Sequence, residues 1–360
     1  MDYIPILVLV ISFLCLLAIG TPVAWSITIS ALLNKGGIAH RLIAFAKTLV
    51  GSLPGGLALI NVISAMLMGA IAGSAMASAS AMGSILGPEM EKEGYSREFG
   101  AAVNITSATT GLIIPPSNVL IVYSLASGGA SIAALFLAGY IPGILTGLFL
   151  MIVASIWAKK KGYKVGKRSN FKDILRTFVA ALPSLFLLVL VIGGIVTGIF
   201  TATEASAIAV LYTLLLGMFY KEITIKTLPK VLLDSASTTA IVMLLIGASM
   251  RMSWVLSYEN IPQDISSGLL SISDNKIVIL LIINLLLLFV GIFMDMTPAV
   301  LIFTPIFLPV VTKLGLDPVH FGIIMILNLC IGLCTPPVGS VLFVGVGVAK
   351  TPIEKVIKPL

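Results

Sequence analysis

The sequence predicts an all-α polytopic membrane protein that contains an inverted repeat with two re-entrant helical hairpins and broken helices. Its 360 residues are 58% hydrophobic and only 10% charged, whereas charged residues make up about 25% of a typical soluble domain. Long apolar runs recur, and about 20 such residues span a hydrocarbon core of about 30 Å. The alternating segments of about ten residues that mark a membrane β-barrel do not occur in the sequence.

The repeat is a sequence pattern that occurs twice at one common offset. Each copy has an apolar helix, a small or polar tip, a return helix, a charged connector and an apolar helix interrupted by Pro-Pro. The equivalent positions are Ser74 and Asp295, Gly111 and Gly332, and the pairs Pro115-Pro116 and Pro336-Pro337. Paired interrupted segments are the best sequence indication of a secondary transporter's substrate site. We therefore predict hairpins at about residues 55–88 and 277–311; two ordinary proline-kinked helices are the alternative.

Asp295 is the residue of greatest functional interest in the pattern. A carboxylate at membrane depth costs several kcal/mol unless it meets a partner, an ion or water. Pro298 and Pro305 follow, and we expect these prolines to break the helix and free backbone carbonyls. Freed carbonyls in lipid must be satisfied inside the protein or face a cavity. An acid beside a broken helix predicts a binding site, although an Asp295 that faces an interfacial aqueous layer would be replaceable.

The first half of the chain, residues 1–158, forms the first copy of the repeat. Ile4–Ala18 predicts a membrane helix, and not a removed signal peptide, because Asp2 replaces the basic region that would precede one. Residues 34–52 are amphipathic, as in an interfacial helix. The expected elements that follow are a helix at Pro54–Ile71, a tip at Gly73-Ser74, an interrupted helix at residues 99–125 and a span at Ser131–Ala158.

Residues 159–176 are a basic connector between the two copies. They hold eight Lys or Arg and one Asp, so the positive-inside rule makes this connector cytoplasmic. The second copy occupies residues 177–360, where Glu204 is expected to be an N-terminal helix charge. Its expected elements are spans at Phe178–Phe200, Thr203–Phe219 and Ala236–Leu256, an interfacial segment at 258–273, and helices from Lys276, Gly322 and Val338.

The two copies differ in length. Gly198 resembles Gly20 in its sequence context, but the spacing from Gly198 to Asp295 exceeds that from Gly20 to Ser74. The difference is about 43 residues, or roughly one span of about 20 residues plus a connector. We expect that the chain lacks this segment at the junction between residues 33 and 34 (33/34). We also expect that a final helix equivalent to Ser131–Ala158 is missing.

Several motifs cover nearly the whole chain: NKGGIAHRLIAFAKTLVG (34–51), GAIAGSAMASASAMGSIL (69–86), MEKEGYSREFGAAV (90–103), IIPPSNVLIVY (113–123), GIFTATEASAIAVLY (198–212), GIFMDMTPAVLIFTPIFLPV (291–310) and GLCTPPVGSVLFV (332–344). In order and spacing they resemble the large membrane subunit of a tripartite ATP-independent periplasmic (TRAP) transporter. Members of that family are longer than this chain by a segment at 33/34 and a final helix.

The resemblance implies an elevator-type secondary transporter in the bacterial inner membrane. A sodium gradient would drive import of an organic anion: a C4-dicarboxylate, a sialic acid, or another sugar or keto acid. A soluble periplasmic binding protein would deliver the substrate, and a small four-helix membrane subunit would brace the scaffold. A stand-alone sodium–carboxylate symporter is the alternative, and neighbouring genes for the two partners would distinguish them.

Oxygen-rich residues at the tips and breaks suit such a mechanism, because sodium prefers carbonyl, hydroxyl and carboxylate ligands. We predict about two Na⁺ sites. The candidates in the first copy are Gly73, Ser74, Ser78, Asn104, Thr109, Thr110 and Gly111, and those in the second are Asp295, Thr297, Pro298, Asn328, Gly332 and Thr335. Ser74, Ser117 and Asp295 are candidates for substrate binding. Neither tip contains Arg or Lys, so helix dipoles and sodium would meet the substrate's charge.

Other classes of function have little support in the sequence. An embedded enzyme would need a catalytic cluster, but His40 and His320 both lie in interfacial segments and no common catalytic motif occurs. A channel would need a filter-like loop. The net charge of +7 lies mostly in short connectors, where it reports topology and not nucleic-acid binding. Cys330 and Cys334 are expected to be buried thiols.

Overall fold

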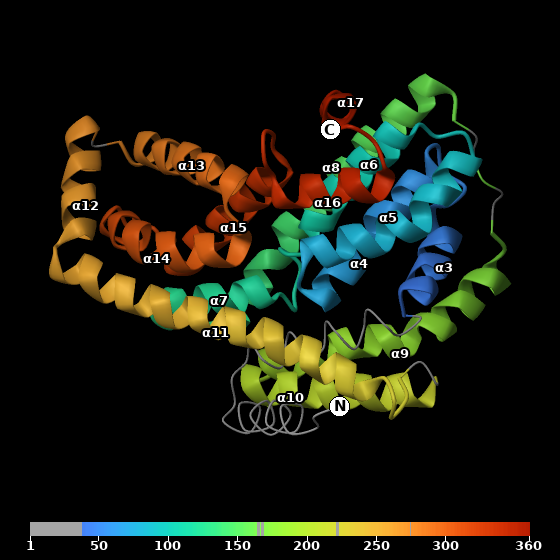
Figure 1. The fold of residues 1–360 in the computed structure, drawn as a ribbon, viewed down its shortest axis with the longest axis horizontal. Coiled ribbons are helices and arrows are strands. Elements are labelled where there is room, and N and C mark those ends of the chain that lie inside the picture. Colours follow the sequence, from blue (N-terminus) through green and yellow to red (C-terminus); the bar gives the residue numbers. More distant parts are fainter. Residues whose placement is uncertain (1–37, 164–165, 167–168, 221–222, 274) are drawn as a thin grey trace, which may run out of the picture.

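The computed structural model describes residues 38–360, apart from 164–165, 167–168, 221–222 and 274 (Figure 1). Within these residues every regular element is a helix, which confirms the all-α prediction. Six of the described helices are long and apolar enough to cross a membrane. They are α8 (Ile132–Lys161), α9 (Phe171–Val196), α10 (Ala202–Phe219), α11 (Leu228–Tyr258), α13 (Lys276–Phe293) and α14 (Met296–Lys313). The predicted helix Ile4–Ala18 and the junction at 33/34 lie outside the described residues.

The amphipathic segment predicted at residues 34–52 contains helix α3 (Ile38–Val50). Its apolar face includes Leu42 and Ala46, both fully buried, and packs against α4 and α9. The Phe45 and Phe178 rings lie 5.5 Å apart between α3 and α9. The Arg41 guanidinium lies 3.4 Å from the centre of the Tyr220 ring, a geometry that favours a cation–π interaction.

The first predicted hairpin is formed by α4 (Gly56–Ala72) and α5 (Ala75–Lys92), which pack against each other. Gly73 ends α4 in the left-handed region, with φ of +62°, which glycine adopts without the steric cost of a Cβ. Ser74 then begins α5, and its hydroxyl accepts a hydrogen bond from the Ala77 N–H at 3.3 Å. The chain therefore reverses at the tip that the sequence predicts.

The first interrupted helix consists of α6 (Arg97–Thr110) and α7 (Asn118–Ala126). Residues 111–117 between them are not helical and contain the Pro115-Pro116 pair. The second copy has the same order: hairpin α13–α14, then α15 (Pro318–Cys334), a break at Pro336-Pro337, and α16 (Ser340–Ala349). Both predicted breaks are confirmed as interruptions of helix.

The prediction that Pro305 breaks the second hairpin is wrong. Helix α14 continues through Pro305 and Pro309, and the interruption of the hairpin is at the tip, where Met294 and Asp295 are not helical. Pro298 lies in the first turn of α14, where the backbone N–H has no partner within the helix and its loss costs little. Packing of buried neighbours such as Phe307 and Val310 holds the helix together across the later prolines.

The two copies pack against each other reciprocally. Helix α7 of the first copy lies against α14 of the second, and α16 of the second copy lies against α5 of the first. Inside each copy, the first hairpin helix packs on the interrupted helix, as α4 does on α6 and α13 on α15. One large buried apolar cluster includes residues of both copies, for example Ile105 and Leu329.

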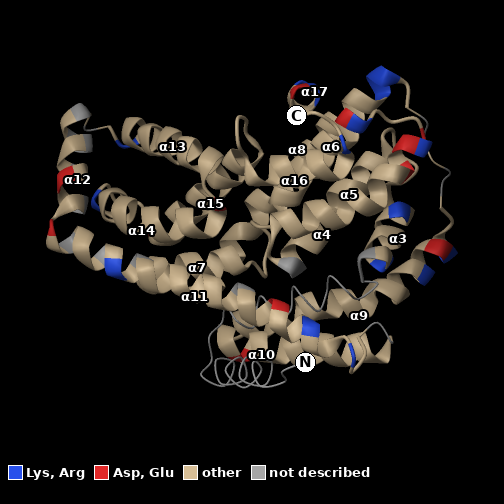
Figure 2. Ribbon diagram, in the orientation of Figure 1, with Lys and Arg blue, Asp and Glu red and all other residues tan. Residues whose placement is uncertain are grey.

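The remaining helices surround these two copies. Helix α11 runs along one side of the molecule and continues into α12 (Ile261–Ile272), and the short α17 (Ile353–Ile357) lies near α6 (Figure 1). Several helices are longer than predicted: α9 begins at Phe171, inside the segment assigned to the basic connector. Most Lys, Arg, Asp and Glu residues lie at helix ends and in connectors, whereas α4, α7 and α15 contain none (Figure 2).

Candidate functional site

Asp295 is placed at the tip of the second hairpin, where it precedes the first turn of α14. The carboxylate does not cap its own helix. Instead it accepts a hydrogen bond from the hydroxyl of Ser340, the first residue of α16, at 3.3 Å. The Gly339 N–H also donates to the Ile292 carbonyl at 2.8 Å. The second tip and the break at Pro336-Pro337 therefore form one local site.

The tip of the first hairpin has a similar neighbour. Gly73 lies against the side chain of Asn118, the first residue of α7, since a Cβ added to Gly73 would be 3.0 Å from the Asn118 Cγ. The Asn118 Oδ1 is buried and has no hydrogen-bond partner. Because buried polar atoms are nearly always paired, this oxygen is a candidate ligand for a cation or a substrate donor. In both copies the tip meets the first residue of the helix after the break.

Sequence reasoning missed Asn118 and Ser340. The only available signal was their place just after the Pro-Pro pairs, where the N-terminus of a half-helix begins. Both side chains come near the tips through folding of the hairpin back onto the break, a tertiary contact that spacing along the chain does not reveal.

The predicted glycines bring the helices close together at the breaks. A Cβ on Gly111 would lie 2.5 Å from the Gly69 Cα, and a Cβ on Gly332 would lie 2.6 Å from the Gly291 Cα. Real Cβ atoms do not approach other atoms so closely, so only glycine fits these positions. Gly111 and Gly332 thus hold each hairpin directly against its interrupted helix.

Most predicted hydroxyl ligands donate their protons to the backbone. Thr109 and Thr110 donate to the Thr106 carbonyl, and Ser117 donates to the Leu112 carbonyl at 2.5 Å. Ser78 donates to Ala65 and Thr335 to Ile331. A hydroxyl that donates its proton keeps its lone pairs. These oxygens therefore remain able to bind a cation, and the donor set suits a hard ion such as Na⁺.

Asn104 and Asn328 donate their hydrogen bonds to residues within the helices and not to residues of the tips. Asn328 donates its amide group to the Asn284 carbonyl and side-chain oxygen, both at 2.9 Å, so it joins α15 to α13. Asn104 is seven residues before Gly111, or about 10 Å along the helix, and donates to the Ala79 carbonyl at 2.7 Å. Thr297 and Pro298 lie in the first turn of α14, close to Asp295.

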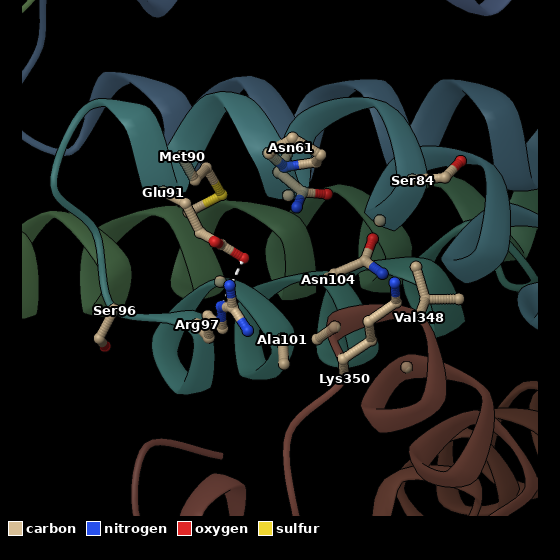
Figure 3. A pocket seen from close by; sticks show the side chains of 16 residues that line it. Asn61, Ser84, Met90, Glu91, Ser96, Arg97, Ala101, Asn104, Val348 and Lys350 are labelled. Atoms are coloured by element: carbon tan, nitrogen blue, oxygen red, sulfur yellow. Dashed lines mark ion pairs between the residues drawn. The ribbon is translucent and has the colours of Figure 1, made fainter.

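Asn104 also lines a polar cavity of about 400 Å³ between α4, α5, α6 and α16 (Figure 3). Asn61 and Asn104 are almost fully buried, and each has a side-chain oxygen without a partner. Lys350 enters the same cavity from the end of α16, and Arg97 forms an ion pair with Glu91 at 2.9 Å. Sequence reasoning missed this cavity because its residues come from four separate elements.

The two breaks lie close to each other. The Cys330 thiol lies 3.4 Å from the Thr109 carbonyl, and the Cys334 thiol 3.6 Å from the Ile105 carbonyl. Both cysteines are buried free thiols, as predicted. Cys330 and Thr109 are equivalent positions of the repeated pattern, so the ends of α6 and α15 meet through corresponding residues. The contacts described above join each tip to its own copy, and the expectation that both tips line one cavity stays a prediction.

Comparison with known proteins shows the family. Residues 27–360 match the family described as "Tripartite ATP-independent periplasmic transporter, DctM component". The chain is 52% identical to the YgiK protein of Salmonella typhimurium over an alignment of 397 positions that covers 99% of this chain and 91% of that protein. It is 41% identical to the C4-dicarboxylate TRAP transporter large permease protein of Pseudomonas aeruginosa, over 91% of this chain and 77% of that protein.

Further relatives are named as permeases for isethionate, sialic acid and 2,3-diketo-L-gulonate. Among solved structures, the YdaH transporter of Alcanivorax borkumensis has a similar fold, with a TM-score of 0.55 at 12% identity, covering 94% of this chain and 80% of that chain. The match to YgiK is longer than the 360 residues of this chain, so that relative has residues that this chain lacks. Their assignment to 33/34 stays a prediction. The chain belongs to the DctM component family of tripartite ATP-independent periplasmic transporters and is a transport permease, not an enzyme.

Proposed function

We propose that the protein imports an organic carboxylate across the bacterial inner membrane, driven by sodium, through an elevator movement of the two hairpins. The observation that carries this proposal is the position of Asp295 at a hairpin tip, within hydrogen-bond distance of the N-terminal residue of α16. An intramembrane acid at the meeting point of two half-helices is the arrangement that a coupling ion and a substrate require.

The substrate's negative charge would be met by helix N-termini. Helices α5 and α14 begin at the tips, and α7 and α16 begin just after the breaks. The N-terminus of a helix carries about half a positive charge and unpaired N–H groups, so it attracts an anion. Neither tip has a Lys or Arg, which leaves these N-termini and bound sodium as the sources of positive charge. Ser74, Ser117 and Asp295 would bind the substrate's polar groups.

Two sodium sites would use the oxygen atoms at the tips and breaks. In the first copy, the hydroxyls of Ser74 and Thr109 and the unpaired Oδ1 of Asn118 are available. In the second copy, Asp295 and the hydroxyl of Thr335 are available. These groups would hold Na⁺, and the ion would supply positive charge next to the substrate's carboxylate.

The reciprocal packing supports the inverted repeat. When two copies are related by a two-fold axis, each contact from one copy to the other occurs twice. The pairs α7–α14 and α16–α5 have this property. A residue near the axis should also touch its own equivalent, as Cys330 touches Thr109. The elevator movement would then carry both hairpins and both breaks past the longer helices.

The family supports two partners. We propose that a periplasmic binding protein delivers the substrate and that a small membrane subunit supports the permease. The relatives are named for C4-dicarboxylates, sialic acid, 2,3-diketo-L-gulonate and isethionate, all of which are small organic acids. We therefore propose an organic acid of this size as the substrate.

The test is uptake by the permease reconstituted in vesicles with its small subunit and binding protein. A thermal-shift screen of the binding protein against organic acids would first choose the substrate. Uptake should require an inward sodium gradient, and equal uptake when potassium replaces sodium would reject sodium coupling. Full uptake without the binding protein would instead favour the stand-alone symporter.

A further inference from the structure

We propose that the polar cavity between α4, α5, α6 and α16 is a binding site for a small hydroxylated organic anion of the cytoplasm. This site is separate from the hairpin tips and does not rest on the proposed transport reaction. The lining residues end at Lys350, so residues 351–360 take no part in it. Of the residues predicted to bind sodium, Asn104 alone lines the cavity, and its amide is bonded to α5 and not to a tip.

The buried end of the cavity presents two hydrogen-bond acceptors that lack donors. Asn61 on α4 is 1% exposed and Asn104 on α6 is 2% exposed, and the Oδ1 atom of each has no partner within the described residues. The Nδ2 atom of Asn104 donates to the Ala79 carbonyl at 2.7 Å, which orients this amide. Because buried polar atoms are nearly always paired, the two oxygens indicate a ligand that carries hydroxyl groups or other hydrogen-bond donors.

The other end of the cavity is charged and exposed. Arg97 forms an ion pair with Glu91, whereas no ion pair of Lys350 occurs within the part of the chain that the structure describes. Figure 3 shows the Lys350 side chain reaching from the end of α16 toward Asn104. Two cations and one carboxylate line this end, and the net positive charge repels a metal cation and attracts an anion. Ammonium and guanidinium groups both donate strong hydrogen bonds to a carboxylate or a phosphate.

The distance between the two ends requires an elongated ligand. Arg97 and Asn104 are seven residues apart on α6, which places them on the same face of the helix and about 10 Å apart along its axis. The cavity volume of about 400 Å³ lies in the range of ordinary small-molecule pockets. The ligand would place its anionic group between Lys350 and Arg97 and its donors at the two amides.

The second copy of the repeat fills the corresponding place with a tyrosine. Tyr123 on α7 packs so closely on α15 that a Cβ added to Gly322 would lie 2.4 Å from its ring. The Tyr123 hydroxyl donates to the Pro318 carbonyl at 2.6 Å. This side chain is fully buried, so its ring occupies the space between α7 and the start of α15.

The equivalent residues of the first copy lack that ring. Gly345 is five residues after the first residue of α16, as Tyr123 is five residues after the first residue of α7. Gly100 follows a phenylalanine on α6, as Gly322 does on α15. Gly345 and Gly100 both line the cavity. The cavity therefore lies at the place equivalent to that of the tyrosine, and glycine at residue 345 leaves it open for a ligand.

The charged end of the cavity faces the cytoplasm. The connector between α5 and α6 packs on the basic connector, where the Tyr95 and Tyr163 rings stack at 4.2 Å and the Ser96 N–H donates to the Tyr163 hydroxyl at 3.3 Å. The positive-inside rule assigns the basic connector to the cytoplasm. Ser96 also lines the cavity. The ligand therefore enters from the cytoplasm and joins α16 of the second copy to the first hairpin.

The test is isothermal titration calorimetry of the purified full chain in detergent. Gluconate carries a carboxylate and hydroxyls, hexanoate carries the carboxylate alone, and sorbitol carries hydroxyls alone. Gluconate should bind about tenfold more tightly than hexanoate or sorbitol, because only gluconate makes hydrogen bonds at both ends of the cavity. Tighter binding of glucose 6-phosphate would identify the anionic group as a phosphate. If neither gluconate nor glucose 6-phosphate binds, the cavity holds only water and the proposal is wrong.

Paired variants locate the bound anion. Lys350→Gln should weaken binding about tenfold, the loss expected when one hydrogen bond to a charged group is removed. Lys92→Gln is the matched control, because Lys92 is exposed beside Glu91 and does not line the cavity. Gly87→Leu should fill the cavity and abolish binding, since Gly87 lines it and an added Cβ has nothing within 4 Å. Gly347→Leu, equally free of neighbours but outside the cavity, should bind like wild type.

Asn61→Leu separates a ligand-binding role from a structural one. Because an unpaired buried amide is costly, this variant should melt at the same temperature as wild type or higher, while its binding of the anion weakens. A lower melting temperature with unchanged binding would overturn the proposal. Asp295→Ala should bind the anion like wild type. Loss of binding in Asp295→Ala, with no effect of Lys350→Gln, would place the anion at the hairpin tips and would also overturn it.

Discussion

Asp295 combines two properties that rarely occur together. It begins a helix, yet its carboxylate leaves the N–H groups of that helix without a side-chain cap. It is partly buried and accepts a hydrogen bond from Ser340 across the tip. An Asp at this position normally caps its helix, and giving up the cap costs about 1 kcal/mol. The residue is therefore positioned for another partner, and the proposed function assigns that partner to sodium or substrate.

Replacing Asp295 tests this assignment. Asp295→Ala should abolish uptake while expression and assembly stay normal, because the variant loses a ligand and also removes a carboxylate that is costly to bury. Asp295→Asn should retain little uptake if the charge binds sodium, and more if the group only accepts a substrate hydrogen bond. Uptake in vesicles and size-exclusion profiles would be measured together. Near-normal sodium-driven uptake by the Ala variant would show that Asp295 is replaceable.

At the scale of elements, the hairpins and breaks could be predicted because their causes are local. Glycine at Gly73 permits the left-handed turn, and Pro-Pro pairs cannot continue a helix. The continuation of α14 through Pro305 could not be predicted, because it depends on packing by distant residues. For the same reason the Asp295–Ser340 contact could not be predicted from the sequence. Asn104 is a predicted ligand because of its amide, but it lines a cavity between α4, α5, α6 and α16.

The close approach of α13 and α15 makes a prediction about stability. Gly332→Ala should force the two helices apart, because its Cβ would lie 2.6 Å from the Gly291 Cα. Overpacking of this kind costs about 1–3 kcal/mol, which a thermal unfolding assay in detergent would detect. Gly347→Ala, on α16, has nothing within 4 Å of its added Cβ and should unfold like wild type. Equal melting temperatures for the two variants would contradict the close contact.

At the scale of the whole molecule, an elevator movement requires one set of contacts to separate during transport. The first break meets α9 and α10 around a cavity of about 30 Å³, lined by Ile121 on α7 and Leu187 on α9. Ile121 and Leu187 line the same small cavity, so cysteines at these two positions can test whether a short cross-linker joins the two elements. The contacts between the first break and α9 must separate if the hairpins and breaks move together as one rigid unit past α9.

A cross-link at this place tests the movement. The double variant Ile121→Cys/Leu187→Cys should take up substrate before treatment, lose uptake after a short reducible thiol cross-linker is added, and recover it with reductant. Each single variant, treated in the same way, controls for labelling of one thiol. Full uptake by the cross-linked protein would mean that α7 and α9 do not move apart, and the elevator mechanism would be wrong for this permease.

The contact between Cys330 and Thr109 has a consequence for how the two copies change over time. Where equivalent positions of the two copies are not in contact, a mutation at one position does not affect the packing of the other. Where the Cys330 thiol touches the backbone carbonyl of its counterpart Thr109, a change at residue 330 also affects the backbone of the other copy, so the two sites are coupled. A larger residue here would press on the end of α6 and the end of α15 together. The sequences of the two copies should therefore diverge most slowly where the ends of α6 and α15 meet, and fastest at the outer faces of the hairpins.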